Sequence, residues 1–100
     1  MHPNFPGGIP KLQEYIHQNL RYPADALKNK VEGRVFVSFI ILKDGRIQDV
    51  TVLKGYGYGT NEEAVRLVQS MPNWIPGKQA GRPVNVKYTI VIPFELSSVK

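Results

Sequence analysis

The sequence contains no cysteine, and this absence removes several classes of site. Disulfide frameworks, thiolate-bound metals and cysteine nucleophiles are excluded, while the redox compartment stays open. Histidine is scarce as well. His2 lies in an irregular end, and His17 has no carboxylate or second histidine at a metal-ligand spacing. The serines lack a nucleophile-elbow setting. We therefore expect no enzyme, no catalytic residue, no metal and no cofactor.

Long apolar runs are also missing. The longest, Val35 to Leu42, is too short to span a bilayer and is interrupted by Ser38. No signal peptide is visible at the start. The chain has 100 residues, of which 42% are hydrophobic and 21% charged, as expected for one globular domain. We predict a single domain over residues 1–100, with an irregular lead-in at 1–8 and a tail at 95–100.

The formal net charge is +5, which favours acidic partners in general. The thirteen lysines and arginines are spread along the chain without a basic block. This distribution is typical of a solvated surface, because a nucleic-acid footprint normally needs clustered cations.

The first third of the chain predicts one long and one short helix. Apolar residues recur at helical spacing over Ile9 to Leu20, and Pro10 suits the first helical turn. The helix should end before Pro23, which can itself open a short helix over Ala24 to Lys28. Phe5, ahead of these helices, is expected to dock onto the body of the domain.

A second long helix is predicted over Asn61 to Met71. Thr60 and Glu63 have the spacing of a capping box, in which each side chain caps the other residue's amide. The glycine-rich segment Gly55–Gly59 before it invites a phosphate-binding interpretation. It lacks the lysine and hydroxyl of a P-loop, and acidic residues follow it, so a flexible aromatic loop is favoured. The buried face of the helix should consist of Ala64, Leu67, Val68 and Met71.

Two strands are predicted to form a hairpin. Arg34 to Leu42 is apolar on both faces, which indicates a central strand. The Asp-Gly pair in Lys43–Arg46 is a strong hairpin-turn signal. Ile47 to Lys54 follows, and its apolar residues change parity, so we predict a β-bulge near Gln48–Asp49.

The last predicted strand, Val84 to Phe94, alternates almost without fault between an apolar and a more polar face. Proline has no amide hydrogen and is confined to edges, strand ends and bulges, so Pro93 marks this strand as an edge. Residues Pro72 to Pro83, ahead of it, are expected to form a loop in which Trp74 plugs the core.

The order helix, strand, strand, helix, strand fixes the expected topology. A strand–helix–strand crossover joins parallel strands with a right-handed connection, so the first strand must lie between the other two. We predict an α+β fold with a three-stranded antiparallel or mixed sheet of order 2-1-3 and two main helices on one face.

An exposed edge strand suits capture of a peptide by strand addition. It is equally compatible with an edge covered by the tail Glu95–Lys100 or by a second copy. Nucleic-acid binding on the open sheet face is the runner-up class. The strand over Arg34 to Leu42 lacks the basic-glycine-aromatic pattern of the common RNA-binding sheet.

An ordered series of short motifs runs from about Pro3 to Leu96. It consists of Phe5-Pro6-Gly7-Gly8, Tyr22-Pro23, Glu32-Gly33-Arg34-Val35, Lys43-Asp44-Gly45, Glu63-Ala64, Trp74, Pro76-Gly77, Gly81-Arg82-Pro83-Val84 and Val91-Ile92-Pro93-Phe94. This series resembles the carboxy-terminal domain of TonB energy transducers, and its opening is similar to TonB-like proteins of Bacteroides-type bacteria. Asn61 stands where the family usually has aspartate.

The resemblance implies a periplasmic energy-coupling domain. Such domains capture the TonB-box peptide of outer-membrane transporters, and an inner-membrane proton-driven motor then opens the transporter for nutrients such as iron chelates (siderophores) or cobalamin. The family's amino-terminal membrane anchor and proline-rich spacer are not in these residues, so we expect an excised domain. Other envelope partners, a signalling role and a homodimer through exchanged strands stay open.

The resemblance also implies where the partner peptide binds. In the family the box pairs with the last strand, which here implies binding by Val84, Asn85, Val86, Lys87, Tyr88, Thr89, Ile90 and Val91. Flanking contacts are expected at Arg82, Tyr22 and Pro23, with Arg82 and Lys87 favouring acidic residues in the peptide.

Overall fold

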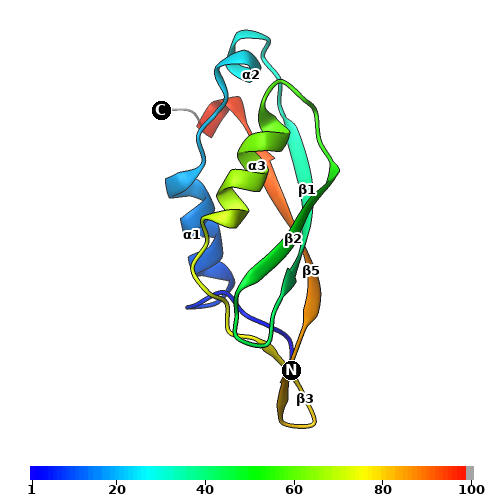
Figure 1. Cartoon of the computed structure of the whole chain (residues 1–100). Helices are drawn as coiled ribbons and strands as arrows, with labels where there is room; N and C mark the ends of the chain where they lie inside the picture. Colours follow the sequence, from blue (N-terminus) through cyan, green and yellow to red (C-terminus); the bar gives the residue numbers. More distant parts are fainter. Residues whose placement is uncertain (99–100) are drawn as a thin grey trace.

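A three-stranded sheet with helices along one face forms the body of the protein (Figure 1). The structure is a computed structural model that describes residues 1–98. Its elements are, in order, α1 (Ile9–Asn19), α2 (Ala24–Lys28), β1 (Gly33–Ile41), β2 (Ile47–Lys54), α3 (Thr60–Gln69), β3 (Gly77–Gln79), β4 (Arg82–Val84), β5 (Val86–Phe94) and a 3-10 helix, η1 (Leu96–Ser98).

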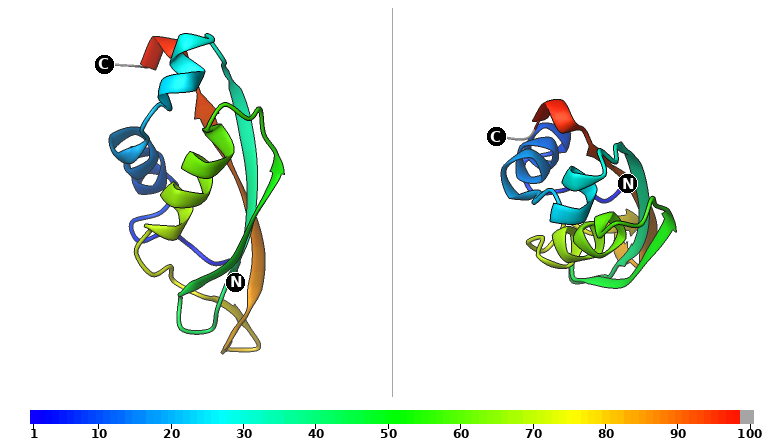
Figure 2. Two further views of the ribbon diagram at one scale, coloured as in Figure 1. Left: turned by 45° about the horizontal axis from the view of Figure 1, so that its top comes forward. Right: turned by 90° about the horizontal axis from the view of Figure 1, so that it is seen from above.

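The sheet has the order β2-β1-β5, and both neighbouring pairs are antiparallel. The predicted α+β fold and strand order are therefore confirmed. Figure 2 shows the sheet curving around the helices, which all lie on its concave side. The molecule is elongated, with extents of 49 × 22 × 17 Å.

The core lies between the concave face and the helices, as period-two alternation along the strands requires. The inward side chains of β1 and β5 are buried, and so are the predicted inward residues of α3. Phe5 and Trp74 are both buried in contact with each other, with ring centroids 5.7 Å apart, so both predicted anchoring roles are confirmed. The buried apolar residues of β1 and β5 are Val35, Val37, Phe39, Ile41, Ile90, Ile92 and Phe94.

The predicted bulge in β2 is confirmed. Ser38 pairs with Thr51 and Ile40 with Gln48, so two residues of β2 stand opposite one of β1. Asp49 has a φ of 56° there. A second, unpredicted irregularity lies where Leu53 is left between the pairs that join β2 to β1.

The predicted capping box of α3 is wrong. Gly59 is the N-cap residue, and the helix has no side-chain cap. Thr60 begins the helix, and its hydroxyl donates to the Gly57 carbonyl over 2.7 Å. The Glu63 carboxylate instead accepts hydrogen bonds from the Arg66 guanidinium, three residues on, and from the Arg21 amide.

Residues Pro72 to Pro83 are not simply a loop, as predicted, because β3 and β4 form a small hairpin there. Val84 belongs to β4, so the predicted last strand is shorter at its start and begins at Val86. The lead-in is also partly ordered: Asn4 and Ile75 exchange two backbone hydrogen bonds of 2.9 and 2.7 Å.

The turn between β1 and β2 is clamped against the segment that carries the tryptophan. Gly45 has a φ of 89°, and its amide donates to the Leu42 carbonyl over 2.8 Å. Its own carbonyl accepts a hydrogen bond of 2.8 Å from the Trp74 amide. A Cβ at Gly45 would lie 2.1 Å from the Trp74 carbonyl oxygen, so only glycine fits.

We expect Gly45→Ala to destabilise the fold by about 3 kcal/mol or more, since left-handed strain adds to a backbone clash. Gly57→Ala is the matched control: Gly57 has a φ of 70° with open space around its Cβ position. Its cost should be the strain alone, about 1–2 kcal/mol. Urea unfolding measures both, and equal losses would contradict the clamp.

Candidate functional site

The two edges of the sheet differ in their fitness to accept another strand. β2 carries two irregularities, and bulges of this kind blunt an edge. β5 runs for nine residues and pairs with β1 in unbroken register from Phe94 to Val86. The regular edge is therefore that of β5.

The turn after β1 fixes which way the peptide groups of that strand point. The Leu42 amide donates to the Arg46 carbonyl, and the Leu42 carbonyl accepts from the Gly45 amide, each over 2.8 Å. Leu42 therefore directs its peptide groups toward β2. Successive residues of an antiparallel strand alternate in this respect, so Ile41 and every second residue before it face β5.

Alternation then assigns the peptide groups of β5. Val86 is the register partner of Ile41, so Val86 and every second residue after it face β1. The residues between them direct N–H and C=O groups to the open edge. These residues are Lys87, Thr89 and Val91, followed by Pro93, whose missing amide falls on the outer side, as expected for an edge.

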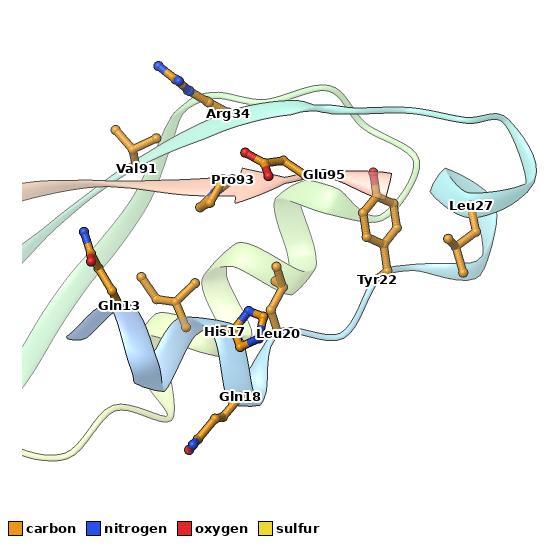
Figure 3. A pocket seen from close by; sticks show the side chains of 11 residues that line it. Gln13, His17, Gln18, Leu20, Tyr22, Leu27, Arg34, Val91, Pro93 and Glu95 are labelled. Atoms are coloured by element: carbon orange, nitrogen blue, oxygen red, sulfur yellow. The ribbon is translucent and has the colours of Figure 1, made fainter. Parts of the chain in front are cut away.

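A groove of about 790 Å³ lies between this edge and α1 (Figure 3). Part of its lining is apolar and comes from Ile16, Leu20, Tyr22, Leu27, Val91 and Pro93. The remainder is polar and comes from Gln13, His17, Gln18, Arg34 and Glu95. The site thus combines unpaired backbone groups with an adjacent hollow.

The tail does not pair with the β5 edge over the residues described. The Leu96 amide donates to Glu32 Oε1 over 2.8 Å, which draws η1 toward the start of β1. Residues 95–98 therefore do not pair with the edge as a strand, although Glu95 lines the groove beside it. Residues 99 and 100 of the predicted tail lie outside the described residues.

A buried carboxylate holds α1 beside the edge. Glu63 of α3 accepts hydrogen bonds from the Arg21 amide over 2.6 Å and from the Arg66 guanidinium over 2.7 Å. Arg66 Nη2 also donates to the Asn19 carbonyl over 2.9 Å. The hydrogen bond to Glu63 raises the pKa of Arg66. This charged cluster ties the carboxyl end of α1 to α3.

Tyr15 makes a second link between the helices. Its hydroxyl donates to the Leu67 carbonyl of α3 over 2.8 Å. Burial raises the pKa of the Tyr15 phenol, Arg66 works against that rise, and Glu63 adds to it. The wall of the groove is thus fixed at two points along α1.

Of the predicted flanking residues, Tyr22 lies at the groove and Pro23 does not line it. The Tyr22 ring packs edge-on against Phe94, with centroids 5.6 Å apart, and its hydroxyl donates to the Val31 carbonyl. Burial raises the pKa of this phenol, and the negative charge of Glu32 adds to the shift. Pro23 instead packs against Gly59.

The structure separates the first predicted docking residues from the rest. Arg82 and Val84 pair with β3, and Asn85 Oδ1 accepts a hydrogen bond of 2.9 Å from the Lys43 amide. Sequence reasoning missed the α1 side of the site, including His17, which it placed on a solvated helix face. No local pattern in the sequence reports that α1 lies beside β5.

Comparison with known proteins gives consistent matches. The profile of the family described as Gram-negative bacterial TonB protein C-terminal matches residues 18–96. The solution structure of Helicobacter pylori TonB-CTD (residues 194–285) is 31% identical, with a TM-score of 0.64, over 86% of this chain and 90% of that one. The solution structure of Pseudomonas aeruginosa TonB CTD is 30% identical, with a TM-score of 0.57, over 80% and 81% of the two chains. No curated protein matches the sequence.

Residues 1–98 contain neither a membrane-spanning helix nor a cluster of metal-ligating side chains. None of the helices there is long and apolar enough to cross a membrane. None of the acidic and histidine side chains described gathers in a group of three or more that would suit a metal ion.

We expect Glu63→Gln to lower the free energy of unfolding by about 1–3 kcal/mol, because it weakens hydrogen bonds to a charged group that is only 8% exposed. Glu62→Gln on the exposed face of the same helix is the control, with a change within about 0.5 kcal/mol. Urea unfolding compares them. A Glu63→Gln protein as stable as the control would show that the cluster does not hold α1.

The raised pKa of Tyr22 predicts a loss of stability at alkaline pH. Its contribution is fully present below the unfolded pKa of about 10 and is lost as pH rises through the higher folded-state pKa. The fall in unfolding free energy between neutral pH and about pH 11 should be smaller in Tyr22→Phe than in the unsubstituted protein. Tyr58→Phe, at a side chain that is 52% exposed, should follow the unsubstituted protein.

Proposed function

The chain belongs to the family of Gram-negative bacterial TonB protein C-terminal domains, and we propose that it captures the TonB-box peptide of outer-membrane transporters by strand addition to β5. One observation carries this proposal: β5 is a regular edge strand whose outward peptide groups are unpaired among the residues described. An extended peptide satisfies such groups with its own backbone.

Strand addition suits a contact that must form and release repeatedly. Lys87, Thr89 and Val91 each present an N–H and a C=O, so a short peptide makes several hydrogen bonds along the edge. Each bond contributes only about 1 kcal/mol net, which keeps the unloaded complex reversible. A pull along the strand loads these bonds together in shear, so the complex resists force better than any one bond would.

The family consists of periplasmic, transport-associated, non-enzymatic domains. Its interaction with outer-membrane transporters supports a transporter as the partner of this chain. We propose that an anchor helix and a spacer beyond these residues join the domain to an inner-membrane motor driven by the proton-motive force. The domain then transmits force to the transporter without catalysing a reaction. Lys87, exposed beside the edge, favours an acidic residue in the bound peptide.

A proline at Thr89 tests the proposal with little damage to the sheet. Thr89 directs its amide outward, so Thr89→Pro removes a docking group without removing a hydrogen bond to β1. We expect at least a roughly tenfold loss of affinity for peptides from the amino-terminal segments of the same bacterium's outer-membrane transporters. Thr89→Val keeps the amide and should bind within about twofold of the unsubstituted protein.

Nuclear magnetic resonance titration measures these affinities and locates the contact. In the unsubstituted protein, amide shifts should concentrate on Lys87, Thr89 and Val91, with smaller changes at the residues that face β1. The spectrum of free Thr89→Pro must retain the dispersion of a folded protein. Peptides that bind while those three amides stay silent would refute strand addition to β5.

A further inference from the structure

The groove beside β5 exposes apolar side chains that the fold of the free chain does not cover. Leu27 is 39% exposed, while Leu20 is half-buried at the carboxyl end of α1. Ile16, 8% exposed, forms part of the floor. Apolar surface at a regular strand edge is costly to leave in water, which indicates that something covers it when the protein works.

An added strand would lie in this space. Neighbouring strands are about 4.8 Å apart, so a peptide paired with β5 occupies the near side of the groove, between the edge and α1 (Figure 3). Side chains alternate along a strand. Every second side chain of the peptide therefore points toward α1, and the others point toward the convex face, where Lys87 and Thr89 are exposed.

The lining restricts which side chains fit. The two charged residues of the lining, Arg34 and Glu95, are both exposed to solvent. The other polar side chains of the lining, Gln13, His17 and Gln18, are exposed as well. The less exposed part of the lining, which forms the floor of the groove, consists of the apolar Ile16, Leu20 and Pro93 and of the Tyr22 ring. A polar side chain placed there would lose water without gaining a hydrogen bond, whereas an aliphatic one would lose only unfavourable hydration.

The size of the groove and the net charge of the chain favour a peptide over a second copy. A volume of about 790 Å³ is that of a small-ligand pocket and admits a few side chains, whereas folded partners need a broad interface. The formal net charge of +5 also opposes pairing of two identical chains at this edge.

We propose that α1 is the second wall of the docking site and selects peptides with aliphatic residues at the alternate positions that face it. This inference rests on the proposed strand addition. It adds a requirement on the sequence of the peptide, namely aliphatic side chains at alternate positions. β5 supplies the backbone contacts, and the groove supplies the selectivity.

Synthetic eight-residue peptides test the requirement directly. In each, threonine alternates with a guest residue, which is leucine, alanine or glutamine, and both ends are blocked. We expect the leucine peptide to bind the unsubstituted domain at least about tenfold more tightly than the alanine peptide, as removal of three buried carbons predicts. The glutamine peptide should bind no better than the alanine peptide.

Two substitutions in the groove should move this preference in opposite directions. Leu20→Gln makes the floor polar and should reduce the preference for leucine at least about threefold. His17→Leu, at an exposed position that the fold tolerates, should increase it. Gln69→Leu is the control for His17→Leu, because Gln69 is exposed at the hollow beside the opposite edge, β2. It should leave the preference unchanged.

The outcomes separate the two proposals. If all guests bind equally while the amides of Lys87, Thr89 and Val91 shift, the inference is overturned and strand addition stands. If none of the guest peptides binds at millimolar concentration, or if light scattering shows a dimer that the peptides cannot dissociate, the inference is also overturned. In that case strand addition is still tested separately, by the affinity of the transporter peptides for the unsubstituted protein and for Thr89→Pro.

Discussion

The buried carboxylate of Glu63 is an interaction on which the shape of the groove beside β5 depends. It joins α3, which packs on the sheet, to the carboxyl end of α1. A buried charge is tolerable only when it is paired and hydrogen-bonded, and here Arg66 and the Arg21 amide meet that demand. Together with the Tyr15 hydrogen bond and the buried Leu12 and Ile16, this network fixes the position of α1 and with it the width of the groove.

The two edges of the sheet differ in regularity, and therefore in how readily another strand can pair with them. A regular, exposed edge risks pairing with any extended chain, and proteins usually blunt it. β2 is blunted by its two bulges. β5 keeps an unbroken register and ends only at Pro93, and the tail that follows turns toward Glu32. Retaining one open edge while closing the other is consistent with a domain whose partner is itself an extended peptide.

Local patterns predicted most of the fold. Periodicity located every main helix and strand, the parity change in β2 located its bulge, and crossover handedness ordered the sheet. The capping box failed because Thr60 and Glu63 satisfy a local rule, whereas the Glu63 carboxylate binds Arg66, three residues on, and the backbone amide of Arg21 in a distant part of the sequence. The hairpin of β3 and β4 was missed because each strand has only three residues and little apolar content. The sequence predicted that the last strand is an edge, but which of its peptide groups face outward and which helix lies beside it depend on tertiary packing that no local pattern encodes.

The single tryptophan gives the molecule an internal optical reporter. Trp74 is buried, its Nε1 has no hydrogen-bond partner, and its ring lies 5.1 Å from that of Tyr88. Tyr88 stands on β5 between Lys87 and Thr89, two of the residues that point peptide groups outward. A strand that docks there and shifts β5 even slightly changes the surroundings of the indole. Its fluorescence is therefore expected to change when a strand docks at the edge, so binding can be followed without any attached dye.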